Sequence, residues 1–132
     1  MAALVPELSV SDMTVSRRFY CDIIGFALRY ERPEEGFAYL ELGAAELMLD
    51  QLGTGREWIT APLERPFGRG VNFQIEVDAV APILDRLAVA GIAPFLPLET
   101  KTYSTLAGDV AQRQFCVTDP DGYLLRFFET LS

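Results

Sequence analysis

The chain contains no histidine and only two cysteines among its 132 residues. Imidazole is the commonest metal ligand and the usual activator of a serine or cysteine nucleophile, so its absence argues against a histidine-based metal centre and against a catalytic triad. Cys21 and Cys116 are too few and too far apart for a disulfide framework or a zinc site. Both lie in apolar stretches, so we expect buried, reduced thiols in a cytoplasmic protein.

The sequence also lacks long apolar runs and clusters of basic residues. No run approaches the roughly 20 apolar residues that cross a bilayer, so no membrane association is predicted. With 11 Lys and Arg against 19 Asp and Glu, the net charge is −8, which argues against nucleic-acid binding because that requires clustered cations. This charge favours cationic ligands, although it also serves simply to keep a small protein soluble.

Aromatic and aliphatic residues are plentiful, with nine Phe, five Tyr and one Trp in a chain that is 50% hydrophobic. A core of that size fits one domain spanning residues 1–132. Within it, two stretches show the same order: a strand, a helix that follows an Asp and ends at a Gly, then three strands. The Asp and the Gly are 13 residues apart in both, at 12 and 25 and at 78 and 91. Asp and Gly are common at helix ends, so coincidence is the alternative, but the agreement favours a duplicated βαβββ unit.

The expected elements divide the chain into module one at residues 1–52, a connecting loop at 53–69 and module two at 70–132. Module one has a strand over 4–10, a helix capped by Asp12 and closed by Gly25, and strands over 26–31, 37–42 and 46–52. Module two has a strand over 71–77, a helix over 80–90 capped by Asp78, an edge strand over 93–98 and a polar loop over 99–109. Two strands, 114–118 and 123–128, then form a tight hairpin around Asp119-Pro120-Asp121-Gly122.

Three motifs, in this order and spacing, resemble the glyoxalase/bleomycin-resistance family of the vicinal oxygen chelate superfamily over nearly the whole chain. They are Ser-Asp-x-x-x-Ser-x-x-Phe-Tyr at 11–20, Ile-Gly-Phe at 24–26 and Asp-Pro-Asp-Gly-x-Leu-Leu at 119–125. The resemblance implies an α+β fold in which two tandem βαβββ modules form a half-barrel cup, with the helices on its outer face. It also implies that ligands or metals bind in the cup, and that a homodimer builds each pocket from both chains.

The same resemblance places the superfamily's three metal-ligand positions at Val5, Asn72 and Arg126. An aliphatic side chain has no lone pair to donate, a guanidinium repels a cation, and a single Asn carbonyl binds a divalent ion weakly. We therefore expect no metal, no cofactor and no metal-dependent glyoxalase, dioxygenase or thiol-transferase chemistry.

Strand alternation predicts which side chains line the cup instead. If the three aligned positions face inward, so do Glu7, Gln74 and Glu76, while their neighbours form the core on the helix side. The acidic residues and Arg126 form either a ligand-orienting group or a structural charge cluster that satisfies itself. Aromatic side chains add stacking surfaces, with Phe67 assigned instead to docking of its loop. The predicted ligand-binding residues are Glu7, Phe37, Trp58, Asn72, Gln74, Glu76, Tyr103 and Arg126.

The sequence thus predicts a metal-free, dimeric binding protein that sequesters a small, planar and, by its net charge, cationic compound. In pattern the chain is closest to metal-free bleomycin-binding resistance proteins. It departs from them in carrying Val110-Ala111 where they often have Trp-Gly, which weakens the assignment to bleomycin itself. The alternative is an enzyme of the glyoxalase superfamily, a lyase, isomerase or dioxygenase, that uses Glu7 or Glu76 as an acid–base group or holds an unusual carboxylate-bound metal.

Overall fold

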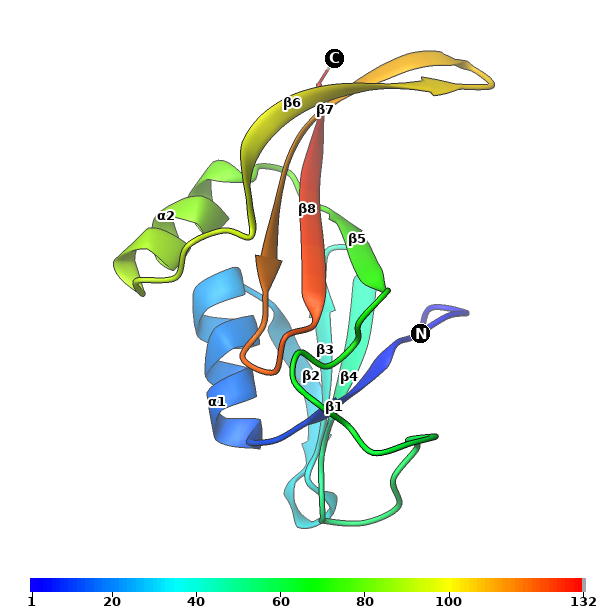
Figure 1. Cartoon of the computed structure of the whole chain (residues 1–132), viewed down its shortest axis with the longest axis vertical. Coiled ribbons are helices and arrows are strands. Elements are labelled where there is room, and N and C mark those ends of the chain that lie inside the picture. The colour runs from blue at the N-terminus through cyan, green and yellow to red at the C-terminus, as the bar shows by residue number, and fades with distance from the viewer. Residues whose placement is uncertain (132) are drawn as a thin grey trace.

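The protein consists of two four-stranded sheets, with its helices packed along one side of both (Figure 1). The computed structural model describes residues 1–131, so Ser132, the last residue of the predicted second module, lies outside the described residues. The first sheet contains β1 Glu7–Val10, β2 Ala27–Arg32, β3 Phe37–Leu42 and β4 Ala45–Gln51. The second contains β5 Asn72–Glu76, β6 Leu96–Thr105, β7 Gly108–Thr118 and β8 Leu124–Leu131. No helix within residues 1–131 is long and apolar enough to span a membrane.

Both sheets have the same topology. The strand order is β1-β4-β3-β2 in the first and β5-β8-β7-β6 in the second. The first strand of each module runs parallel to its last strand, and the remaining pairs are antiparallel. This correspondence confirms the predicted α+β fold of two tandem βαβββ modules. The exact module boundaries stay a prediction.

The first helical segment begins and ends where the sequence predicts. It comprises α1 Met13–Arg17 and continues as a π-helix, η1 Arg18–Ile24. The Asp12 carboxylate accepts hydrogen bonds from the backbone N–H groups of Thr14 and Val15, at 3.0 and 3.3 Å. Gly25 ends the segment with φ of 113°, a left-handed conformation that other residues rarely adopt. The wider π-turn was not predicted.

The second helix, α2 Ala81–Val89, shows that the prediction of an Asp78 cap was wrong. The N-cap residue is Val80, whose side chain makes no capping bond. Asp78 lies two residues too early in the chain to take that role. The backbone N–H of Val80 instead donates to the Glu129 carboxylate on β8 at 3.3 Å, so the second sheet supplies the missing acceptor.

The prediction of a polar loop over 99–109 was also wrong, because β6 and β7 form a long hairpin there. Their register runs from Glu99 opposite Gln114 to Thr105 opposite Gly108. In Figure 1 this hairpin extends well beyond the rest of the second sheet. Its polar, largely exposed residues show no apolar alternation, yet Thr and Tyr have high strand propensity. β6 is an edge strand, as predicted, and its prolines precede or fall within the register shift between Leu96 and Glu99.

Strand alternation correctly predicts the side that packs against the helices. Leu8 and Val10 on β1, Ile75 on β5, and Leu125 and Phe127 on β8 are all buried in one core cluster that spans both modules. The thiols are free, and Cys116 is buried as expected, whereas Cys21 is only half-buried. The alternate residues of each strand therefore form an open face on the side away from the helices.

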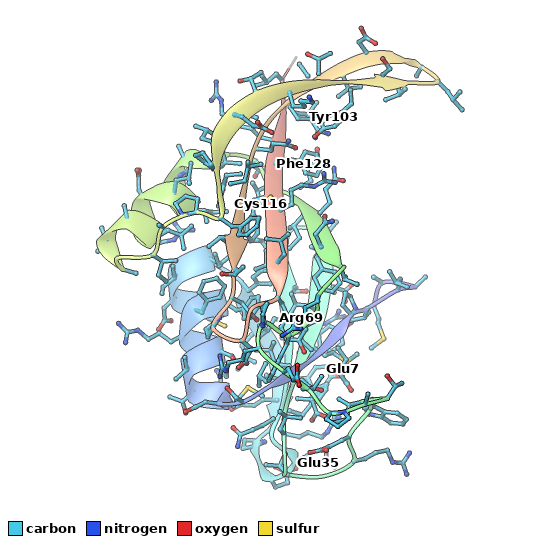
Figure 2. All side chains as sticks on the ribbon, viewed as in Figure 1. Glu7, Glu35, Arg69, Tyr103, Cys116 and Phe128 are labelled. Carbon is cyan, nitrogen blue, oxygen red and sulfur yellow. The ribbon has the colours of Figure 1, made fainter. Side chains whose placement is uncertain are left out.

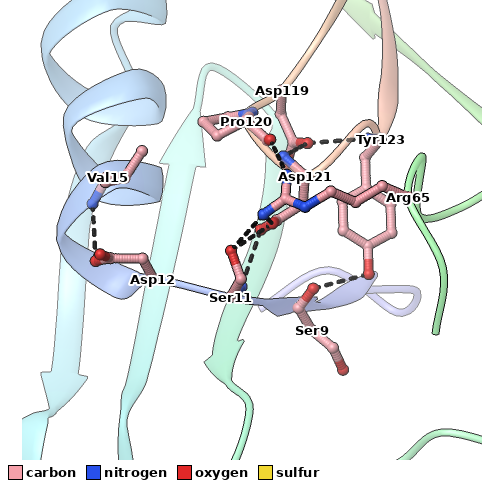
Figure 3. Close-up of polar contacts among 9 residues, drawn as sticks. All are labelled: Ser9, Ser11, Asp12, Val15, Arg65, Asp119, Pro120, Asp121 and Tyr123. Atoms are coloured by element: carbon pink, nitrogen blue, oxygen red, sulfur yellow. Dashed lines mark hydrogen bonds and ion pairs between the residues drawn. The ribbon is translucent and has the colours of Figure 1, made fainter. Parts of the chain in front are cut away.

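The Asp119-Pro120-Asp121-Gly122 turn joins the two modules (Figure 3). Asp119 accepts from the backbone N–H groups of Asp121 and Tyr123, both at 2.9 Å, and from the buried Tyr20 hydroxyl at 2.7 Å. Asp121, 1% exposed, accepts from the Ser11 backbone N–H at 3.0 Å and hydroxyl at 2.6 Å, and pairs with Arg65 at 2.9 Å. Gly122 has φ of 97°, and a Cβ there would clash with Pro66. The turn therefore fixes module one and the connecting loop against module two.

A Tyr20→Phe variant should lose about 1–3 kcal/mol of unfolding free energy, because it leaves the buried Asp119 carboxylate short of one donor. Tyr30→Phe is the matched control, since Tyr30 is 41% exposed and Tyr20 is fully buried. Urea denaturation followed by circular dichroism measures both. Equal losses of unfolding free energy in the two variants would show that the Tyr20 hydroxyl does not hold the modules together.

Candidate functional site

The predicted site residues lie on the open faces of the sheets in two separate groups. Figure 2 shows Glu7 and Glu35 in the lower half of the molecule, and Tyr103, Cys116 and Phe128 in the upper half. One group belongs to the first sheet and the connecting loop, and the other belongs to the second sheet. A single chain therefore does not bring all the predicted residues into one site.

The first group forms a cavity of about 250 Å³, which we call the acidic pocket. Three of the predicted residues line it: Glu7 from β1, Phe37 from β3 and Trp58 from the connecting loop. Trp58 is 66% exposed, so its ring is not needed to fill the core. The remaining lining residues are Arg32, Glu35, Asp50, Gly55 and Arg56.

Strand register explains how these residues meet. Phe37 stands opposite Asp50 on β4 and opposite Arg32 on β2, and Asp50 also stands opposite Ser9 on β1. Residues directly opposite in neighbouring strands point to the same face of a sheet. Glu7, two residues before Ser9, shares that face.

Two of the three carboxylates that line the acidic pocket, those of Glu7 and Asp50, have raised pKa values. Burial raises the pKa of Glu7, the charge of Asp50 raises it further, and Arg32 opposes this rise. Burial also raises the pKa of Asp50, with Glu57 and Glu35 adding to the effect and Arg32 again opposing it. Such a pair attracts a cation, which would stabilise both ionised forms.

Aromatic rings form one wall of the acidic pocket and extend beside it. Tyr30 stacks on Phe37 with centroids 5.9 Å apart and on Tyr39 at 5.1 Å. Two guanidinium groups already lie over ring faces: Arg32 is 4.0 Å from the Phe37 centroid, and Arg56 is 5.1 Å from that of Trp58. Two flat cations of the chain itself therefore lie against the aromatic rings of this pocket.

The second group lies on the open face of the second sheet and is polar. Arg126 donates to the side-chain oxygen of Gln74, which stands opposite it on β5. The Arg126 Nε is buried and finds no hydrogen-bond partner among residues 1–131. Glu76 accepts from Thr130 at 3.2 Å, and the Tyr103 hydroxyl donates to Gln114 at 3.1 Å. This face therefore presents a guanidinium flanked by amide groups.

The remaining predictions have different outcomes. Asn72 is exposed at the start of β5. None of the ion pairs found within residues 1–131 joins Glu7, Glu76 and Arg126, so these residues do not form the self-satisfying charge cluster considered above. Phe67 is 7% exposed and meets Tyr123 edge-on at 6.0 Å, which confirms that it docks the connecting loop.

The superfamily's metal positions do not suit a metal here. Val5 precedes β1, whereas Asn72 begins β5 and Arg126 lies within β8, where its guanidinium is turned to Gln74. Throughout residues 1–131, no three or more His, Cys, Asp or Glu side chains are grouped so as to hold a metal ion. The donor set therefore supports no metal-assisted step.

Sequence reasoning missed Asp50, Arg32, Glu35 and Arg56 in the acidic pocket. Strand alternation could have predicted Asp50, because Leu47 and Leu49 on the same strand face the core and Asp50 therefore faces the other way. Arg32 joins the pocket only through its pairing with Phe37 across a turn. Cys116 and Gln114 on the second face were missed as well; both are buried.

Comparison with known proteins agrees with this architecture. The sequence pattern of the Glyoxalase/Bleomycin resistance protein/Dioxygenase superfamily matches residues 3–127. A bleomycin resistance protein of Geobacillus stearothermophilus is 27% identical over 140 aligned positions, covering 99% of this chain and 98% of that protein.

Two solved structures show the same fold. The structure of TioX from Micromonospora sp. ML1 has a TM-score of 0.73 at 22% identity, covering 99% of this chain and 100% of that one. A bleomycin resistance determinant encoded on the transposon Tn5 has a TM-score of 0.62 at 19% identity, covering 98% of both chains. Together with the sequence match over residues 3–127, the paired βαβββ sheets identify the chain as a member of the Glyoxalase/Bleomycin resistance protein/Dioxygenase superfamily.

Proposed function

We propose that the protein is a metal-free homodimer that sequesters a small, planar, cationic compound, such as an antibiotic of the bleomycin type. The observation that carries this proposal is the acidic pocket, in which the carboxylates of Glu7 and Asp50 lie beside Phe37 and the exposed ring of Trp58. Sequestration requires affinity and no bond-breaking chemistry. The bleomycin resistance protein that is 27% identical over nearly the full length supports the same class of function.

Neither charge nor stacking alone accounts for tight binding. An aromatic contact contributes about 0.5–1.5 kcal/mol beyond its area burial. Attraction to the carboxylates adds to this, and it weakens as salt screens the charges. A ligand that is both flat and cationic uses the two contributions at once, which is why we favour it over a neutral planar compound.

The dimer completes the site by joining the two open faces. β1, which carries Glu7, and β5, which carries Asn72, Gln74 and Glu76, are both edge strands. Edge strands are prone to association, so placing β1 of one chain near β5 of its partner would protect both. Such an arrangement would place the acidic pocket of one chain opposite Arg126 and Tyr103 of the other. A ligand could then be held from two sides.

The rival function is an acid–base enzyme of the same superfamily. The raised pKa of Glu7 favours this rival, because general acids and bases are tuned toward neutral pH. Mass spectrometry of bleomycin recovered from the complex separates the two functions, since an enzyme changes its substrate. Near-unit occupancy of zinc, manganese, nickel or iron in untagged protein, with activity lost on chelation, would also support the enzyme. Tight binding of an anionic acid would point instead to Arg126 as its anchor.

The first test is direct titration with bleomycin. The chain has a single tryptophan, so its intrinsic fluorescence should respond saturably at micromolar ligand through Trp58. Calorimetry should show that Trp58→Ala weakens binding about tenfold, which is the loss expected for one stacking contact.

Phe95→Ala serves as the control, because Phe95 is also an exposed aromatic at 70% but lies outside the acidic pocket. The proposal fails if no saturable response occurs, or if the two alanine variants bind equally well.

The second test uses pH. Protonation removes the negative charge of a carboxylate, and the pKa of both Glu7 and Asp50 is raised. Binding of a permanently charged flat cation such as N-methylquinolinium should therefore weaken as the pH falls through these raised pKa values. The weakening should begin at a higher pH than it would with carboxylates of ordinary pKa. Calorimetry from about pH 8 to about pH 4 measures this. The Glu7→Gln/Asp50→Asn double variant should bind weakly at every pH, and a wild-type affinity that ignores pH while the protein stays folded would contradict the model of binding.

The third test addresses the shared pocket. Light scattering over a dilution series should give the mass of a dimer. Trp58→Ala and Tyr103→Ala homodimers should each bind poorly, yet mixing them and allowing subunit exchange should restore binding in about a quarter of the pockets, because half of the dimers then carry one intact pair of faces. A compact monomer, or no recovery after confirmed exchange, would place the whole site within one chain.

A further inference from the structure

The guanidinium of Arg32 occupies a position that suits a ligand cation. It lies 4.0 Å above the centroid of Phe37 and 5.9 Å from that of Tyr30. Its Nε forms an ion pair with Glu35, another residue that lines the acidic pocket. Arg56 repeats the arrangement over Trp58 at 5.1 Å. The chain's own flat cations thus cover both aromatic faces that the acidic pocket offers to a ligand.

The contacts that hold Arg32 are of a kind that can be exchanged. Its side chain is 45% exposed and that of Glu35 is 58% exposed. Exposed ion pairs and exposed cation–π contacts are both weak, because water competes for the charged groups. A ligand cation that also gains burial and a stacking surface can therefore displace the guanidinium.

Arg32 also acts on the carboxylates that would receive the ligand. Its positive charge opposes the rise in the pKa of Glu7 and of Asp50 that their burial causes. In the free protein its positive charge partly offsets the negative charges of Glu7 and Asp50. When a ligand cation enters, it meets this positive charge as a direct competitor.

We propose that Arg32 is a built-in competitor for the ligand: it occupies the cation position over Phe37 in the free protein and leaves that position when a flat cation binds. This inference rests on the proposed function of the acidic pocket. Its consequence is selectivity. A neutral planar compound cannot replace the guanidinium beside the carboxylates, whereas an amidinium or guanidinium group matches it in shape and charge.

Arg32→Met tests the inference, because methionine keeps an apolar side chain over Phe37 and removes the charge. Benzamidine, a flat amidinium, should bind this variant about tenfold more tightly than wild type, equivalent to ~1.4 kcal/mol. Benzamide, its neutral isostere, should gain far less. Arg18→Met is the control: it makes the same change in net charge on the helical side, outside the acidic pocket. Arg32→Gln provides a second variant in case methionine itself blocks the cavity.

A second measurement follows the side chain itself. The Arg32 Nε–H resonance, assigned by its loss in Arg32→Met, should be shifted upfield in free protein by the ring of Phe37. Saturating bleomycin should return it to the position of an exposed arginine. If bleomycin binds and the resonance stays where it was, the proposed function stands and the competitor role is wrong.

The other outcomes are equally distinct. Weaker benzamidine binding by Arg32→Met, or an equal gain in Arg18→Met, would overturn the inference, since Arg32 would then be a ligand contact or act only through net charge. Benzamidine binding by Arg32→Met with no bleomycin binding by wild type would uphold the competitor role and reject bleomycin as the ligand. If neither variant nor wild type binds either cation, both proposals fall.

Discussion

Two buried carboxylates, those of Asp119 and Asp121, hold the structure together at the point where its modules meet. Asp119 fixes the closing turn through two backbone N–H groups and reaches the first helical segment through Tyr20. Burial raises the pKa of Asp119, while the hydrogen bonds from Tyr20, Tyr123 and Asp121 oppose that rise. Buried acids are costly unless they are fully bonded, so this turn tolerates little change. Because this turn fixes one module against the other, it also fixes the position of each open face.

A second contact between the modules joins α2 to the end of the first helical segment. The Arg86 guanidinium on α2 donates to the carbonyls of Ile23 and Ile24 at 2.6 and 2.7 Å, at the end of the first helical segment. The helices thus share one core, and both sheets turn their open faces away from it. Each face carries only part of the predicted site, so a single chain keeps the predicted residues in two separate groups.

The acidic pocket is lined by side chains of both charges, with the acidic ones in excess. Glu7, Asp50 and Glu35 outnumber Arg32 and Arg56, and both arginines lie over aromatic rings instead of filling the cavity. In the function proposed here, this excess of acids attracts cations, and Arg32 favours those that can compete with a guanidinium. An exposed aromatic wall alone would accept any flat molecule, and the surrounding charges narrow that choice.

Local sequence was sufficient for the elements and for the direction of many side chains. The Asp12 cap, the Gly25 exit and the alternation along β1, β5 and β8 depend on neighbours in the chain, so their physics can be read from it. The Asp78 cap failed because Glu129, 51 residues further along, supplies that bond through β8. The hairpin over 99–109 was missed because its polar residues carry no apolar period.

The candidate site, too, was predictable from the sequence only in part. Glu7, Phe37 and Trp58 were identifiable as candidates, yet their union with Arg32 and Asp50 depends on register across four strands. Likewise, Arg126 was predicted as an open-face residue and Tyr103 as a loop aromatic, but their separation from Glu7, which Figure 2 shows for Tyr103, was not predicted. The sequence by itself determined the family, the repeated modules and the side chains turned away from the core. Only the tertiary structure decided which of those side chains meet, because strand pairing and the Asp119–Tyr20 contact join residues that are distant along the chain.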